Sequence, residues 1–244
     1  MTPPLRIAMW SGPRTISTAL LRAWENRHDT AVIDEPFYAH YLHATGFGHP
    51  GRDEVIAAYE TDWRRVVAQI TGPVPGGKPV FYQKHMAHHM LPGIDEGWLD
   101  DFANAFLIRD PRAVIASYAK RRDAVTLQDI GLARQLSLFE TVRRRTGSVP
   151  PVIDAADVLA DPPGLLTRLC DALGVPFDER MLAWPAGPRP SDGVWAKHWY
   201  HAVERSTGFA APDRAAVPDL PVDLEPLAAD CRASYDRLYA HRLV

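Results

Sequence analysis

Short apolar segments that each end in polar or charged residues constrain the fold of this chain most strongly. Runs of this kind, bounded by turn residues, are typical of buried strands. Helix-like segments separate most of them, and strands that alternate with helices favour a mostly parallel sheet with helices on both faces. We therefore predict an α/β fold in three layers, with a mostly parallel central sheet. The predicted strands are residues 5–10, 31–33, 80–83, 104–108 and 151–154.

Amphipathic periodicity and helix-end signals indicate where the helices lie. Pro111 suits the first turn of a helix, because its missing N–H would be unpaired there anyway. Gly174 suits the position that follows a helix C-terminus. The Gly- and Pro-rich residues 71–79 predict a loop. The predicted helices are residues 17–26, 53–70, 111–118, 127–145, 161–173 and 224–239.

Composition limits the classes of partner and compartment. The chain has 244 residues without a recognisable linker, so we expect a single domain over residues 1–244. The formal net charge of −3 gives no reason to expect a nucleic-acid or membrane partner. Only two cysteines occur, and a signal peptide or an apolar run of about 18 residues is absent. We expect a cytoplasmic protein with a small-molecule partner, and a homodimer stays open.

The first strand end predicts a phosphate site, because ligands of such sheets bind at the carboxyl ends of the strands. Residues 11–20 read SGPRTISTAL, so a turn at Gly12 leads into a helix N-terminus, where free N–H groups and the helix dipole favour anions. Arg14 adds a positive charge, and Thr15, Ser17 and Thr18 add hydroxyl groups. The Walker lysine is absent. The alternative is an ordinary strand–helix turn with Thr15 as the N-cap.

The fourth strand end predicts a second basic site. Residues 109–112 read RDPR, and Arg109 at the strand tip has the geometry to contact a phosphate in bidentate fashion. Ser117, two turns into the following helix, can reach the same group. The alternative is a surface arginine paired with Asp110. The run of residues 120–122 (KRR) either ends this helix on the solvent side or adds a contact to the same phosphate.

Together these segments resemble the sulfotransferases that use 3′-phosphoadenosine 5′-phosphosulfate (PAPS) as donor. Residues 13–18 (PRTIST) are similar to the family's loop for the 5′-phosphosulfate, and RDPR through Ser117 matches the spacing of its 3′-phosphate segment. Residues 154–173 are similar to a further family segment. Residues 192–199 (DGVWAKHW) resemble the family's GxWxxH segment near the 3′ side of the nucleotide, which makes Lys197 a candidate donor contact.

This resemblance implies a P-loop-like nucleotide-binding fold and transfer of a sulfuryl group to a hydroxyl or amine of a small molecule. Two positions depart from the family pattern. Ile16 stands where the family usually has glycine. A Cβ there either blocks close approach of the backbone to the phosphosulfate or indicates a loop of a different shape. Arg14 replaces the family's lysine, which keeps the charge and adds a forked donor geometry.

Two residues are candidates for the group that accepts the proton of the sulfate acceptor. His85 follows Lys84 after the third strand, similar to the family's Lys-x-His context but with a spacing one residue shorter. Glu35 lies in a Glu-Pro segment after the second strand, as in sugar-sulfating members. We predict His85 as the base and Glu35 as its helper or an acceptor contact. The alternatives are that His85 is a hydrogen-bonded residue of the pocket wall and that Glu35 pairs with a nearby arginine.

A cluster of His85, His88 and His89 raises the question of a metal. No cysteine or carboxylate at ligand spacing completes the cluster, so we predict that no metal is needed. Two other functions stay open: an ATP-dependent phosphotransferase, disfavoured by the missing Walker lysine, and a nucleotide-binding protein without catalysis, which Ile16 makes conceivable. The sequence does not identify the acceptor, whose pocket we expect residues 38–51 and 183–209 to line.

Overall fold

The computed structural model describes residues 3–120, 125–210 and 219–244. Its strands form one sheet in the order β2-β3-β1-β4-β5, and every neighbouring pair is parallel. The predicted strands are all present, and the third runs on from Gln83 to Met86. The strands are β1 (Leu5–Ser11), β2 (Thr30–Asp34), β3 (Val80–Met86), β4 (Ala103–Ile108) and β5 (Val152–Asp154).

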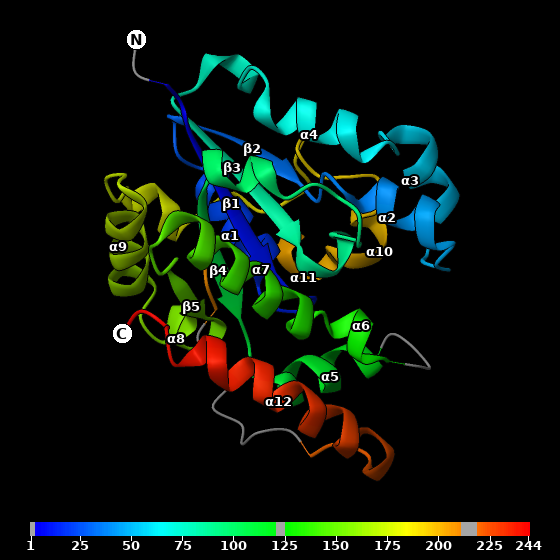
Figure 1. The fold of residues 1–244 in the computed structure, drawn as a ribbon. Coiled ribbons are helices and arrows are strands. Elements are labelled where there is room, and N and C mark those ends of the chain that lie inside the picture. Colours follow the sequence, from blue (N-terminus) through cyan, green and yellow to red (C-terminus); the bar gives the residue numbers. More distant parts are fainter. Residues whose placement is uncertain (1–2, 121–124, 211–218) are drawn as a thin grey trace.

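Helices follow most strands and cover both faces of the sheet (Figure 1). Within the described residues none of them is long and apolar enough to cross a bilayer. The α-helices are α1 (Ser17–Glu25), α2 (Tyr38–Thr45), α3 (Arg52–Ala58), α4 (Trp63–Thr71), α5 (Pro111–Ala119), α6 (Leu127–Ile130), α7 (Leu132–Thr146), α8 (Ala155–Ala160), α9 (Pro162–Leu173), α10 (Ala196–Trp199), α11 (His201–Glu204) and α12 (Glu225–Tyr239). Short 3₁₀ segments lie at Pro75–Gly77, Ala87–His89, Gly97–Asp101, Glu179–Leu182 and Val222–Leu224.

The central strand β1 shows why the chain forms three layers. Successive side chains of a strand point to opposite faces. Ile7 and Met9 pack with α1, α8 and α9, whereas Ala8 and Trp10 pack with α4, α7 and α12. All four side chains are fully buried. The α/β three-layer prediction is therefore confirmed.

Two predicted helices are each broken into two. Residues 53–70 form α3 and α4, because the chain becomes extended at Tyr59 and the Asp62 side chain caps α4 by accepting from the Arg64 N–H. Residues 127–145 form α6 and α7, because Gly131 adopts a φ of 73° between them. The hydrophobic periodicity continues across both breaks, which is why a single helix was predicted. Helices α2, α8, α10 and α11 were not predicted.

The site is positioned by the strand order. Strand β1 lies between β3 and β4, so the chain leaves it toward one side of the sheet for β2 and β3 and returns to the other side for β4. Such a reversal opens a crevice at the carboxyl ends of the strands. Helices α2, α3, α10 and α11 gather at the end to which the strand arrows point (Figure 1). Buried residues of α2, α3 and α10 form a separate apolar cluster there together with Trp195 and Tyr200.

Candidate functional site

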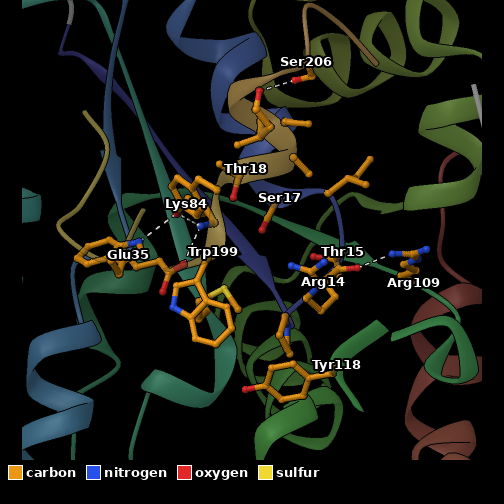
Figure 2. Close-up of a pocket in the computed structure, with 18 of the residues that line it drawn as sticks. Arg14, Thr15, Ser17, Thr18, Glu35, Lys84, Arg109, Tyr118, Trp199 and Ser206 are labelled. Carbon is orange, nitrogen blue, oxygen red and sulfur yellow. Dashed lines mark hydrogen bonds and ion pairs between the residues drawn. The ribbon is translucent and has the colours of Figure 1, made fainter. Parts of the chain in front are cut away.

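A cavity of about 370 Å³ lies at the carboxyl ends of the strands, within the size range of small-molecule sites. The first loop and the start of α1, residues 13–19, form one wall, and three strand-end residues, Glu35, Lys84 and Arg109, face it. Figure 2 shows Arg14 and Arg109 on one side and Glu35 and Lys84 on the other, with Ser17 and Thr18 between them. Residues from the ranges 38–51 and 183–209 also line this cavity, and that the acceptor binds against them stays a prediction. These additional lining residues include Tyr38, His49, Trp195, Trp199, Tyr200, Val203, Ser206 and Phe209.

The first loop presents the N-terminus of α1 to the cavity. No side chain caps α1 in the described structure, so its first N–H groups are available to an anion. Thr15 is not the N-cap, because its hydroxyl donates to the Gly12 carbonyl at 2.9 Å and Ile16 occupies the cap position. Gly12 itself does not line the cavity. A Cβ at Gly12 would lie 2.7 Å from the Ile130 carbonyl oxygen, which explains the need for glycine.

Ile16 carries a backbone conformation that glycine adopts more readily. Its φ is 63°, in the left-handed region, and Arg14 has a φ of 59°. For a residue with a Cβ this conformation costs about 1–2 kcal/mol. The Ile16 side chain packs at the edge of the apolar cluster that contains α1 and α9. The loop therefore has the backbone shape that a glycine at position 16 would favour, with a packed side chain added.

The two basic segments contact each other directly. Arg109 Nη1 donates to the Arg14 carbonyl oxygen at 2.7 Å, and Arg14 Nε donates to Ser117 Oγ at 3.0 Å. Asp110 caps α5 and forms an ion pair with Arg232, so the alternative pairing of Arg109 with Asp110 is wrong. Burial lowers the pKa of the Arg109 guanidinium, although Asp154 and Asp110 oppose this effect.

Of the basic run that follows α5, Lys120 is exposed. Arg121 and Arg122 lie outside the described residues, so both alternatives for this basic run stay predictions.

Lys84 is a cavity residue that the sequence analysis missed as a functional group. Its Nζ donates to Asp34 Oδ1 at 2.8 Å, to Glu35 Oε1 at 2.7 Å and to the Tyr200 hydroxyl at 2.9 Å. The Tyr200 hydroxyl also donates to Asp34. Burial opposes the ammonium charge, but Asp34 and Glu35 outweigh it and hold the pKa of Lys84 well above its ordinary value. A charged residue within a strand that the sequence predicts to be buried was the signal that could have indicated this role of Lys84.

Glu35 reaches the cavity from the end of β2. Its backbone φ is 44°, and its Oε2 lies 4.0 Å from His89 Nδ1 while Oε1 is held by Lys84. Burial raises the pKa of the Glu35 carboxyl, Lys84 opposes this, and Asp34 adds to it. The alternative of an arginine partner is wrong, because the partner is a lysine.

His85 does not line the cavity, so its predicted placement beside the acceptor is wrong. Its ring stacks on Trp10 at 4.5 Å, and its Nε2 lies 3.2 Å from Gln83 Oε1. Burial lowers the pKa of His85 to about 3. Because side chains alternate along a strand, Lys84 and Met86 face the cavity and His85 faces the opposite layer. His88 and His89, just beyond the strand, do line the cavity.

Lys197 also lies away from the cavity, so its predicted placement at the donor is wrong. Its exposed Nζ pairs with Glu54 Oε2 at 2.5 Å. The short helix α10 turns Lys197 outward, while Trp195 and Trp199, on either side of it in the chain, line the cavity.

The histidines form no metal centre in the described part of the chain. There, no group of three or more His, Cys, Asp or Glu side chains is placed to hold a metal ion. The prediction that the reaction needs no metal stays a prediction.

Comparison with known sequences matches residues 5–238 to the sulfotransferase domain family. Branched-chain-amino-acid aminotransferase-like protein 1 of Arabidopsis thaliana is 39% identical over 214 residues, which cover 88% of this chain and 38% of that protein. Its relative, protein 2 of the same name, is 34% identical over 235 residues, or 96% of this chain and 41% of that protein. The chain thus spans about two fifths of the length of these relatives, and their names describe far longer proteins.

Two solved structures share the fold over the whole chain. The sulfotransferase domain from the curacin biosynthetic pathway has a TM-score of 0.53 at 17% identity and covers 100% of this chain and 99% of that one. A sulfotransferase from Alicyclobacillus acidocaldarius has a TM-score of 0.58 at 16% identity and covers 100% and 98%. At such identities the likeness shows the fold alone.

Proposed function

The chain belongs to the sulfotransferase domain family, and on this premise we propose that it transfers a sulfuryl group from PAPS to a hydroxyl or amine of a small-molecule acceptor. One observation carries the proposal: the basic strand ends at Arg14 and Arg109 are hydrogen-bonded to each other at one side of a cavity. The opposite side holds Glu35 and Lys84. A single cavity thus combines an anion-binding end with a carboxylate end.

The donor end fits a nucleotide with phosphate groups at both the 5′ and 3′ positions. The uncapped N-terminus of α1, with Ser17 and Thr18, suits the 5′-phosphosulfate. Arg109 suits the 3′-phosphate, because a half-buried guanidinium beside a backbone carbonyl has further N–H groups to offer. Ser117 supports this end by accepting from Arg14.

The chemistry requires charge stabilisation on the donor and proton removal from the acceptor. The acceptor atom forms a bond to sulfur, and the bridging S–O bond of the phosphosulfate breaks. The electron pair of that bond leaves on the phosphate of 3′-phosphoadenosine 5′-phosphate (PAP). Arg14 and the dipole of α1 stabilise this phosphate. The acceptor proton leaves toward the Glu35 end of the cavity.

Incubation with radiolabelled PAPS and a panel of phenols, aliphatic alcohols, sugars and amines tests the proposal. We expect label in at least one acceptor, PAP as the second product, and the same rate with a chelator present. Transfer of phosphate from ATP in place of sulfate from PAPS would contradict it. Binding of PAP without turnover of any acceptor would point to the non-catalytic alternative.

A further inference from the structure

His89 lines the cavity, and aromatic rings pack closely against its imidazole. It ends the 3₁₀ segment Ala87–His89 that follows β3, and it is 2% exposed. The Tyr38 ring stacks on its imidazole at 4.9 Å with an interplanar angle of 3°, and the Tyr41 ring stacks at 4.8 Å with an angle of 25°. Both tyrosine rings, which come from α2, therefore pack nearly parallel against the imidazole. The His88 ring also contacts this imidazole, at 4.4 Å with an interplanar angle of 73°.

The two nitrogen-bearing edges of His89 differ. Nδ1 is buried without a hydrogen-bond partner in the described structure, and it lies 4.0 Å from Glu35 Oε2. The other oxygen of Glu35 is fixed by Lys84 at 2.7 Å, which leaves Oε2 toward His89. Because His89 lines the cavity and its Nδ1 faces Glu35, Nε2, which points away from Nδ1 across the ring, is the nitrogen left to contact a ligand.

We propose that His89 is the catalytic base, which takes the acceptor proton on Nε2, and that Glu35 is a positioning residue that accepts the Nδ1–H. This inference rests on the proposed function and names the residue that removes the proton. The acceptor O–H bond breaks as its oxygen bonds to sulfur, the proton moves to Nε2, and the sulfuryl group leaves PAP behind. The 4.0 Å gap is the loose state expected before substrates bind.

The charges around His89 suit a neutral base. Burial lowers the pKa of His89 well below its ordinary value, and His88, His49, Lys84 and His85 act in the same direction. The Tyr38 and Tyr41 rings add no charge, and Glu35 is the carboxylate that faces the ring. A lowered pKa keeps the imidazole neutral down to lower pH. We therefore expect kcat/KM to show no inflection near the ordinary histidine pKa of about 6.5.

Replacing the imidazole tests the base directly. In His89→Ala we expect turnover with PAPS to fall by about 10²–10⁴-fold, whereas the Kd for PAP stays within about twofold. Free imidazole should restore part of the turnover, because removal of the His89 side chain leaves a space of that size beside the Tyr38 and Tyr41 rings. The matched control is His43→Ala, on the exposed side of the same helix as these tyrosines, which should neither lose turnover nor respond to imidazole. Unchanged turnover in His89→Ala overturns the proposal.

A second measurement tests the pairing of His89 with Glu35 in the absence of PAPS. Nitrogen NMR of the histidine rings at neutral pH should show His89 as the neutral tautomer with the proton on Nδ1. Glu35→Gln should shift it toward the Nε2–H tautomer. A wild-type ring protonated on Nε2 would overturn the dyad even if the enzyme turns over. Conversely, absence of any sulfuryl transfer would remove the proposed function while leaving the tautomer result intact, so the two failures are distinguishable.

Discussion

The two sides of the cavity each carry a buried or half-buried cation, but in opposite settings. Lys84 is enclosed by Asp34 and Glu35, both within 2.8 Å of its Nζ. Arg109 donates to a backbone carbonyl, and in the described residues no carboxylate lies within ion-pair distance of it. The charge of Lys84 is therefore compensated by the chain itself, whereas that of Arg109 remains for a ligand. One side of the cavity is therefore the one that we propose for the anionic donor, and the other holds a compensated, hydrogen-bonded cluster.

The largest effect that sharpens this comparison is on stability. Lys84→Met leaves the buried Asp34 and the partly buried Glu35 without their cation, and removing one partner of a buried pair costs about 3–5 kcal/mol of the free energy of unfolding. Arg109→Met breaks a hydrogen bond to a carbonyl and should cost about 1–2 kcal/mol. Urea denaturation of both variants checks the difference. Equal losses would mean that the two cations have the same structural role.

The next effect is on binding. Arg109→Ala should weaken PAP by about 2–4 kcal/mol, the loss typical of removing a charged hydrogen-bond partner. It should barely change the affinity for adenosine 5′-phosphate, which lacks the 3′-phosphate. Arg112→Ala is the matched control, because Arg112 follows on α5 but pairs with Glu225 outside the cavity. Calorimetry in which Arg109→Ala weakens both nucleotides equally would remove the assignment of the 3′-phosphate to Arg109.

The smallest effect concerns the loop between the strand and α1. At most positions glycine is less stable than alanine, but the φ of 63° at Ile16 should reverse this order. Both substitutions lose the packing of the isoleucine side chain, so their comparison isolates the backbone. We expect Ile16→Gly to be more stable than Ile16→Ala by about 1 kcal/mol in thermal or urea unfolding. The usual order would show that position 16 is not left-handed in solution.

The parts of the site that the sequence predicted are those that follow local rules. A strand end followed by a helix N-terminus places Arg14, Ser17 and Thr18 at the cavity wherever the sheet is parallel, and the same holds for Arg109. The prediction that placed His85 at the cavity, and so missed Lys84, was wrong for a different reason. Both faces of β3 are buried, so its burial pattern does not show which face meets the cavity.

Residues further from the strand ends depended on tertiary packing. The orientation of Lys197 follows from how α10 packs against α2 and α3, and a four-residue helix has no periodicity to reveal it. The rings that pack against His89 belong to Tyr38 and Tyr41 on α2, a helix that was not predicted from the sequence. Contacts between segments of this kind carry no short-range sequence signal.

Calorimetric titration of the unmodified protein with PAP, adenosine 5′-phosphate and ATP tests the central claim most directly, namely that the cavity holds separate sites for the 5′- and 3′-phosphate groups of one nucleotide. The account predicts that PAP binds tightest, by about 2–4 kcal/mol over adenosine 5′-phosphate. ATP, which has no 3′-phosphate to meet Arg109, should bind more weakly than PAP with or without magnesium. Tighter binding of ATP than of PAP, dependent on magnesium, would contradict the account and favour phosphoryl transfer.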